Sequence, residues 1–88
     1  MRHVRATLDQ VYSDQAIDRM IELYCDWREA SADVRAAYAG YSQSQPSDRA
    51  LAFAAYGAAL DQEQSASEAY AIHIVHMARA GDRVRGRT

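Results

Sequence analysis

The sequence has no lysine, no asparagine, one cysteine, one proline and four glycines among its 88 residues. A single cysteine cannot close an intramolecular disulfide, and it cannot supply the thiolate pairs of a zinc ribbon or a CxxC redox motif. We expect this residue, Cys25, to pack as a small apolar side chain that is at least half-buried. With so few helix breakers, the chain is expected to form long regular elements.

Long apolar runs and a strong net charge are missing as well. The longest apolar stretch near either end, 69–78, is interrupted by His73 and His76, which predicts neither a transmembrane span nor a secretory signal. A formal net charge of -2 and a mean hydropathy of -0.44 are typical of a mildly acidic soluble protein and argue against a basic nucleic-acid binder. We therefore expect one cytoplasmic domain without membrane contact.

Two repeating apolar patterns, one on each side of a loop-like segment, predict an all-α fold. The segment is 40–47, which is rich in serine and glutamine and contains the single proline. On each side of it, large residues recur at steps of three and four, the spacing of an a/d seam between packed helices. The expected seams are Ile17, Met20, Tyr24, Trp27, Ser31, Val34, Tyr38 and Tyr41 in the first pattern, and Phe53, Tyr56, Leu60, Glu63, Ser67, Tyr70, Ile74 and Met77 in the second.

Capping residues indicate where the two helices begin and end. Ser13 is a suitable N-cap for the first helix, and Ser47, which follows Pro46, is suitable for the second. Gly81 stands at the C′ position where the second helix is expected to end, and Thr7 opens a capping box for a short N-terminal helix. We therefore expect one helical domain over 1–88, divided into an N-terminal segment (1–12), a first helix (13–41), a loop (42–47), a second helix (48–80) and a basic tail (81–88).

A second capping box, inside the second helix, leaves an alternative open. Ser65 and Glu68 form an S-x-x-E pattern ahead of an apolar run, which would break the helix within the polar stretch 61–68 and give a three-helix bundle. That stretch contains no glycine and no proline. We therefore favour one continuous second helix.

The short connection makes the two helices antiparallel neighbours in a hairpin. Matching small residues to large ones sets Ser31 opposite Leu60, and it sets Trp27 opposite Glu63. Arg28 would then be the natural partner of the Glu63 carboxylate. This carboxylate either forms a polar layer that fixes the register or serves as a ligand-binding or acid–base group.

The second helix carries more apolar surface than one neighbouring helix can cover. A stripe of mostly alanine lets another helix approach closely, and past Glu68 the helix is apolar on nearly all sides. Two helices alone enclose no core, so we expect the N-terminal helix and a second subunit to complete a four-helix bundle. The residues assigned to this contact are Ala52, Ala55, Ala59, Gln62, Ala66 and Ala69 in the stripe, with Ile72 and Val75 beyond it.

Charged residues gather in two places. Six carboxylates fall on one face of the first helix, either as a solvated face or as a docking strip for a basic protein partner. Six arginines near the two chain ends would meet at one end of the hairpin, where they form either a solubilising tail or a weak contact for nucleic-acid phosphates. The carboxylates are those of Asp14, Asp18, Glu22, Asp26, Glu29 and Asp33, and the arginines are Arg2, Arg5, Arg79, Arg83, Arg85 and Arg87.

Few residues are candidates for chemistry. His73 and His76 could share a metal ion at their i, i+3 spacing if further ligands came from elsewhere, with Glu63 as one candidate. No acid stands three residues before either histidine, as the Glu-x-x-His pattern of ferritin-like sites requires. Because no second acid or nucleophile accompanies Glu63, we expect no enzyme activity and no cofactor.

One stretch covering about half of the chain resembles small actinobacterial helical proteins to which no function is assigned. A composition with many alanines and arginines but no lysine or asparagine is also typical of a GC-rich bacterial genome. The resemblance implies an origin but no activity. It rests on Tyr24, Trp27, Arg28, Val34, Arg35 and Tyr38, followed by 52–56 and 60–61.

These patterns lead to three hypotheses. The first is a non-enzymatic interaction module, a homodimeric helical bundle whose acidic face or basic end contacts a protein partner. The second is a metal-binding or small-ligand-binding bundle that uses His73 and His76. The third is a weak nucleic-acid contact through the arginine-rich ends.

Overall fold

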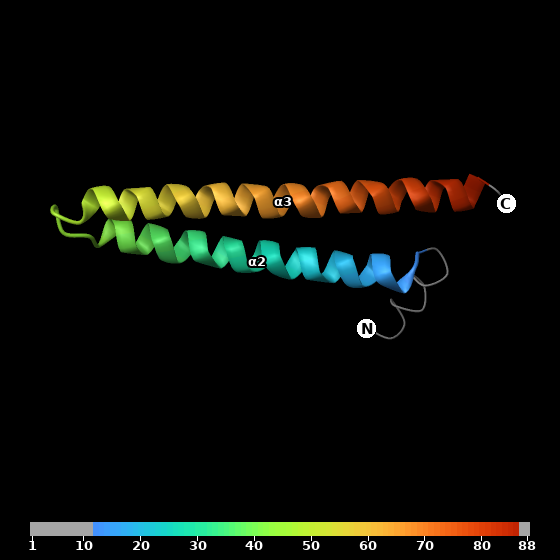
Figure 1. Ribbon diagram of the computed structural model, residues 1–88, viewed down its shortest axis with the longest axis horizontal. Coiled ribbons are helices and arrows are strands. Elements are labelled where there is room, and N and C mark those ends of the chain that lie inside the picture. Colours follow the sequence, from blue (N-terminus) through green and yellow to red (C-terminus); the bar gives the residue numbers. More distant parts are fainter. Residues whose placement is uncertain (1–11, 87–88) are drawn as a thin grey trace.

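The computed structural model describes residues 12–86, and within that range it shows two long antiparallel helices joined by a short turn (Figure 1). Helix α2 spans Asp14–Ser42 and helix α3 spans Arg49–Gly86. The hairpin is a rod of 64 × 23 × 15 Å. Its radius of gyration is 18.5 Å, whereas a compact domain of this length would have about 12 Å. The expected all-α hairpin is therefore confirmed.

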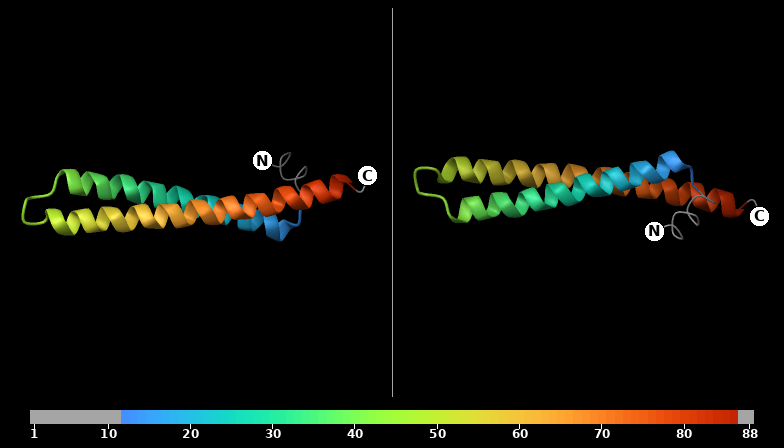
Figure 2. Two further views of the ribbon diagram at one scale, coloured as in Figure 1. Left: turned by 90° about the horizontal axis from the view of Figure 1, so that it is seen from above. Right: turned by 90° about the horizontal axis from the view of Figure 1, so that it is seen from below.

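The described part of the chain contains no strand, and neither of its helices is long and apolar enough to cross a membrane. The two helices cross at a shallow angle, as the views from above and below show (Figure 2). The short N-terminal helix expected in 1–12 lies almost wholly outside the described residues.

Helix α2 begins where its cap residue predicts. Ser13 has extended backbone angles, and its Oγ accepts a hydrogen bond from the Ala16 amide at 3.1 Å. The Ser13 carbonyl accepts from the Ile17 amide, also at 3.1 Å. Asp14 adds a negative charge in the first turn, where the positive end of the helix dipole favours it.

The end of α2 is closed by hydrogen bonds from the turn. The Gln43 amide donates to the Ala39 carbonyl at 3.1 Å. The Tyr41 carbonyl accepts both the Ser44 hydroxyl at 2.8 Å and the Ser44 amide at 3.2 Å. These bonds satisfy carbonyls that the end of a helix leaves without partners. Helix α2 therefore ends at Ser42, one residue later than expected.

Helix α3 begins two residues after the expected cap. The first helical residue is Arg49, so Asp48 rather than Ser47 occupies the N-cap position. The Asp48 carbonyl accepts from the Ala52 amide at 2.9 Å, and the Asp48 amide donates to the Gln45 carbonyl at 2.9 Å. The second bond closes a tight turn through 45–48, which delays the start of the helix beyond Ser47.

Helix α3 is continuous, so the alternative of a break within 61–68 is wrong. Ser67 bonds backward from its hydroxyl to the Gln64 carbonyl at 3.0 Å, and the Gln64 amide group donates to the Glu68 carboxylate one turn on at 3.1 Å. Both bonds run along the helix surface and leave its backbone ladder intact. Ser65 is an exposed residue within the helix and caps nothing.

The expected helix end at Gly81 is also wrong. Gly81 is buried within α3, and no glycine in the described range has a positive φ, which a C′ glycine normally adopts. Glycine permits the left-handed conformation but does not impose it. The residues expected to form a basic tail therefore continue the helix as far as Gly86.

The buried core is small. Among the residues whose burial the structure describes, the buried hydrophobic side chains are Ile17, Leu23, Ala30 and Met77, which are exposed by 1%, 7%, 5% and 7%. Most of the expected seam is confirmed, because Ile17 and Met77 are buried and ten further seam residues are half-buried, those at 20, 27, 31, 34, 41, 56, 63, 67, 70 and 74. The seam residues at 24, 38, 53 and 60 are exposed instead, and on α2 the neighbouring residues 23 and 30 are buried.

The register differs from the expected one by one layer. Ser31 contacts Glu63 instead of Leu60, and the ring of Tyr38 packs on Tyr56 with centroids 5.5 Å apart. Tyr41 packs on Phe53 at 5.6 Å. Sliding two seams by one layer keeps both seams in contact, so their spacing could not distinguish the two registers. The large rings of facing residues can pack on each other here because they extend past the edge of the interface, where the helix backbones leave more room.

Core packing is tested by a matched pair of isoleucines. Ile17→Ala should lower the free energy of unfolding by about 2–4 kcal/mol, because it leaves a cavity at the most buried side chain. Ile72→Ala, at a side chain that is 58% exposed, should cost less than about 1 kcal/mol. Chemical denaturation at one protein concentration measures both. Equal costs would contradict the core described here.

Candidate functional site

The two long sides of the hairpin differ in chemistry. On one side, the aromatic side, apolar rings and aliphatic chains stand beside the interface and remain exposed. On the other, the acidic side, a shallow groove runs between the helices. Six large residues make up the exposed apolar surface of the aromatic side: Ile21, Tyr24, Tyr38, Phe53, Leu60 and Val75, which are 40% to 59% exposed.

One aromatic cluster lies near the middle of the rod. The rings of Trp27 and Tyr70 stack with centroids 5.7 Å apart, and Tyr24 contacts both rings, at 6.4 Å from Trp27 and 5.8 Å from Tyr70. Beside this cluster is a shallow hollow that Glu68 and Val75 also line. The cluster joins the two helices across their seam, yet Tyr24 remains 45% exposed.

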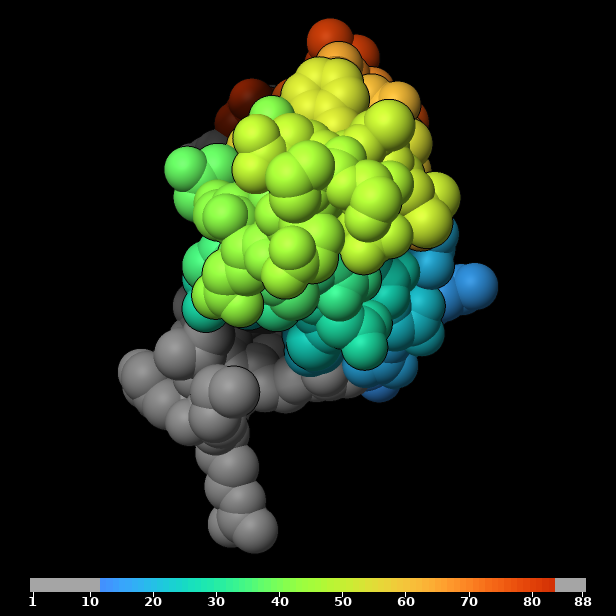
Figure 3. Space-filling model, turned by 90° about the vertical axis from the view of Figure 1, so that its left-hand side faces the viewer, coloured from blue at the N-terminus to red at the C-terminus, as the bar shows by residue number. Residues whose placement is uncertain are grey.

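A second cluster lies near the turn. The ring of Tyr41 packs on Phe53 and, at 6.3 Å, on Tyr56, which in turn meets Tyr38. Tyr38 and Phe53 stay 55% and 59% exposed. Figure 3 shows the molecule from this end, where the side chains of the turn and of the adjoining helix ends pack closely. Tyr41 and Tyr56 are half-buried in the seam, as its spacing predicts, whereas Tyr38 and Phe53 are exposed at its edge.

Between the two clusters lies a polar layer. The Ser31 hydroxyl donates to a Glu63 carboxylate oxygen at 2.7 Å in a partly buried position. Arg28, the expected partner of Glu63, is exposed and forms no ion pair in the described chain. The shift in register explains this correction, because it replaces Trp27 and Arg28 by Ser31 opposite Glu63. A charge-assisted hydrogen bond holds the carboxylate in the seam.

Five of the predicted carboxylates are placed by the hollows they line: Asp26, Glu29 and Asp33 line the groove of the acidic side, and Asp18 and Glu22 line a hollow with His73. All six are exposed, as expected for a charged face: Asp14, Asp18, Glu22, Asp26, Glu29 and Asp33. Arg19 forms an ion pair with Glu22 at 3.1 Å, and Asp14 and Asp18 have interaction partners too. The groove on this side, of about 720 Å³, has Leu23 and Ala30 among its apolar lining.

The alanine stripe of α3 also lies beside this groove. Ala66 and Ala69 line the groove and are half-buried, as are Ala52 and Ala59, whereas Ala55 is exposed. Small side chains at these positions let α3 lie close to α2. The stripe is therefore largely used within the hairpin, and the larger exposed apolar surface is on the aromatic side.

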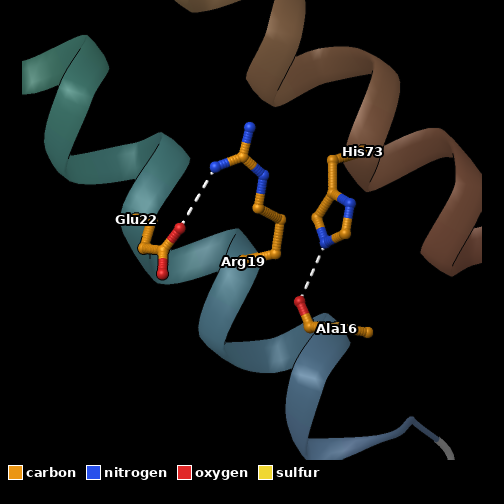
Figure 4. Close-up of polar contacts among 4 residues, drawn as sticks. All are labelled: Ala16, Arg19, Glu22 and His73. Atoms are coloured by element: carbon orange, nitrogen blue, oxygen red, sulfur yellow. Dashed lines mark hydrogen bonds and ion pairs between the residues drawn. The ribbon is translucent and has the colours of Figure 1, made fainter.

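The two histidines do not converge on one site. His73 reaches from α3 to the first turn of α2, where its Nε2 lies 2.8 Å from the Ala16 carbonyl oxygen (Figure 4). A carbonyl only accepts hydrogen bonds, so Nε2 carries the proton. His76 is exposed and lines a different hollow, with Ile72 and Val75. In the described range, no three potential metal-ligating side chains come together.

Two further expectations concern single charged or reactive groups. Cys25 is exposed, which corrects the expectation that it is at least half-buried. It lies two residues from Trp27, and a step of about 200° around the helix turns it away from α3.

The arginine-rich end is described in part. Arg79 and Arg83 are exposed near the end of α3. The side chains of Arg2, Arg5, Arg85 and Arg87 lie outside the described residues.

Most residues of the aromatic side belong to the two expected seams, whose spacing predicts an interior position for them. Tyr24, Tyr38, Phe53 and Leu60 all belong to the expected seams, and Ile21 was not singled out. The size of these side chains is the signal that points to an exposed position. Two helices meet along one line, so they cannot enclose every large ring that the seam contains.

Comparisons of the chain with protein-family models, with curated proteins and with solved structures find no match. The resemblance to actinobacterial helical proteins stays a prediction.

A double-mutant cycle tests the polar layer and the register together. Ser31→Ala and Glu63→Ala should show a coupling energy of about 1–2 kcal/mol, because each change removes the same partly buried hydrogen bond. A control cycle of Arg28→Ala with Glu63→Ala should couple by less than about 0.5 kcal/mol. Urea denaturation supplies the free energies. A stronger coupling to Arg28 would show that the helices pair one layer away.

Proposed function

We propose that this protein is a non-enzymatic interaction module that acts as a homodimer. Two hairpins pack through their aromatic sides and form a four-helix bundle. The observation that carries this proposal is the aromatic side itself, on which six large apolar side chains are 40% to 59% exposed. Large apolar side chains that gather exposed on one side of a protein mark an interaction site.

The surface area of the chain supports an obligate partner. The chain exposes 6810 Å², whereas a compact monomer of 9.8 kDa would expose about 5,200 Å². The excess of about 1,600 Å² per chain matches, when doubled, the burial in obligate homodimers. Covering the aromatic side would thus give the pair of hairpins the enclosed core that one hairpin lacks.

A second copy suits the aromatic side better than an unrelated partner. A two-fold interface uses the same patch on both subunits, so the patch must complement itself. The aromatic side meets this requirement because it is apolar at both clusters and has one satisfied polar pair, Ser31 and Glu63, between them. Aromatic rings at such a contact add edge and stacking interactions to the burial of apolar area.

In this dimer the acidic side stays exposed and is the surface for a further partner. Its groove has apolar residues on the floor, and Asp26, Glu29 and Asp33 line it. Carboxylates so placed favour a basic protein partner and disfavour nucleic acid. Earlier along α2, Asp18 and Glu22 line a hollow with His73 and extend the same charge. The alanine stripe contributes to the groove rather than to self-association.

The other two hypotheses receive less support from the described residues. A metal site would need His73 and His76 to meet, but one contacts Ala16 and the other faces a separate hollow. A catalytic role for Glu63 would need a second convergent group, and its close partner is the Ser31 hydroxyl. For the nucleic-acid hypothesis, the structure describes the side chains of Arg79 and Arg83 alone among the six arginines of the chain ends.

The first experiment is the absolute mass by light scattering after size exclusion, at two protein concentrations, with and without a chelator. We expect twice the chain mass of 9.8 kDa, unchanged by the chelator, because the contact is apolar. A monomer at both concentrations would refute the homodimer. A dimer lost in the chelator would instead support the metal-binding hypothesis.

Substitutions on the two sides locate the contact. Tyr38→Glu with Phe53→Glu should give a monomer, because four carboxylates would be buried in the dimer. Leu51→Glu is the matched control, since Leu51 is 77% exposed and lines a hollow with Ala52 and Ala55 at the other side of the turn end. It should remain dimeric.

The separated hairpin has few buried residues, so helix content must be measured on the same samples by circular dichroism. If the variant unfolds on separation, the wild-type unfolding midpoint should still rise with protein concentration, as it does for any obligate dimer. A midpoint that is independent of concentration, together with a dimeric Tyr38→Glu, Phe53→Glu variant, would place the contact elsewhere.

A further inference from the structure

Charges of opposite sign flank the aromatic side on its two helices. On α2, the exposed Arg28 lies four residues after Tyr24 and three before Ser31, which places it on the same side of the helix. Arg35 repeats this position one heptad later. On α3, Glu68 lines the hollow beside Trp27 and is exposed. In this middle part of the rod, the α2 edge thus carries the positive charges of Arg28 and Arg35, and the α3 edge carries the negative charge of Glu68.

The arginines have no counter-ion within the hairpin. In the described chain neither Arg28 nor Arg35 forms an ion pair. The carboxylates of Asp26, Glu29 and Asp33 line the groove of the acidic side, away from them. Unpaired arginines next to an apolar surface are suited to the rim of an interface.

A two-fold axis along the rod would bring the opposite charges together. This axis sets α2 of one copy beside α3 of the other. Because the rotation is about the long axis, it does not change the position of any residue along the rod, which we call its height. The heights follow from the contacts within the hairpin, where Trp27 meets Tyr70 and Ser31 meets Glu63. Arg28 therefore stands level with the part of α3 between 63 and 70. Glu68 of the second copy lies within that interval.

A two-fold axis across the rod would instead bring like charges together. This axis sets α2 against α2 and α3 against α3, and the two aromatic clusters pair only when the axis passes near the Ser31–Glu63 layer. Arg28 of one copy would then lie beside Arg35 of the other. The two Glu63 carboxylates would also approach each other. Like charges juxtaposed at an interface oppose that arrangement.

We propose that the two-fold axis of the homodimer runs along the rod and that Arg28 of α2 pairs with Glu68 of α3 in the second copy. This inference rests on the proposed homodimer and adds its geometry. The clusters then pack on their own counterparts, the middle one on the middle one and the turn-end one on the turn-end one. All neighbouring helices in the bundle are antiparallel.

Charge reversal tests the proposal with the full chain. The dimer dissociation constant is measured by sedimentation equilibrium at low salt for the wild type, Arg28→Glu and the double variant Arg28→Glu, Glu68→Arg. Arg28→Glu should raise the dissociation constant about tenfold, because two pairs become repulsive. The double variant restores both pairs with reversed sign and should return to within about threefold of the wild type. The difference should shrink in 1 M salt, where the Debye length is about 3 Å.

The control is Arg19→Glu, which changes the net charge equally but lies on the acidic side, where Arg19 pairs with Glu22. It should leave the dissociation constant near that of the wild type. A lower dissociation constant for Arg28→Glu would show relief of repulsion from Arg35 and would overturn the orientation. An unchanged value would also overturn it. A monomeric wild type would refute the homodimer itself, so the two failures are distinguishable.

Disulfide trapping gives a second readout that does not depend on affinity. In a Cys25→Ser background, chains with Arg28→Cys are mixed with chains carrying Glu68→Cys and are oxidised after exchange. A crosslinked pair of unlike chains is expected. Efficient crosslinking of Arg28→Cys chains to Arg35→Cys chains, in place of the first pair, would establish the other axis.

Discussion

The structure depends on the fact that a helix in a hairpin has one neighbour. Two cylinders in contact share a single line, and only residues on that line can be fully covered. In the described part of the chain, the buried residues are Ile17, Leu23, Ala30, Met77 and Gly81, and the other residues of the seam are half-buried or exposed. Every side chain next to the line therefore stands on one of two long sides. The nature of those sides determines what the molecule can bind.

Their chemistry comes from the choice of residues one step on either side of the seam. On α2, Leu23 and Ala30 lie towards the acidic side, while Tyr24 and Ser31 lie towards the aromatic side. On α3, alanines lie towards the acidic side, and larger residues such as Phe53 and Leu60 lie towards the aromatic side. Small residues on one side draw the helices together there. The rings on the other side project past the interface, which is why Tyr24, Tyr38 and Phe53 stay exposed on that side.

Much of the fold could be predicted from the sequence because it rests on local signals. The Ser13 cap and the long stretches without glycine or proline define α2 closely, and the seven-residue spacing identifies most of the contact line, all but the residues at 24, 38, 53 and 60. The register could not be obtained in this way, since every layer repeats the same spacing. The end of α3 was missed at Gly81 because a glycine ends a helix only when the chain around it turns away.

The candidate site was harder to predict because it depends on a displacement of one residue. Spacing placed Tyr24 and Tyr38 in the seam, and only the positions of the helices in space show that their rings lie at its edge. The contact between His73 and Ala16 joins residues 57 positions apart, so no local pattern could reveal it. The exposed position of Cys25 follows from the same rotation of α2 that buries Leu23.

The contacts of the hairpin are nested around the turn, and this order has a consequence for how the chain folds. The pair Tyr41 and Phe53 closes a short loop, Ser31 and Glu63 close one of 32 residues, and Ala16 and His73 close one of 57. The entropy lost on closing a loop grows with its length, so the turn-end cluster is the least costly contact to make from the unfolded chain. Each contact then shortens the loop that the next one must close. The aromatic rings near the turn thus have two roles. They form the first contacts between the two helices during folding, and they are part of the surface that stays exposed in the folded hairpin.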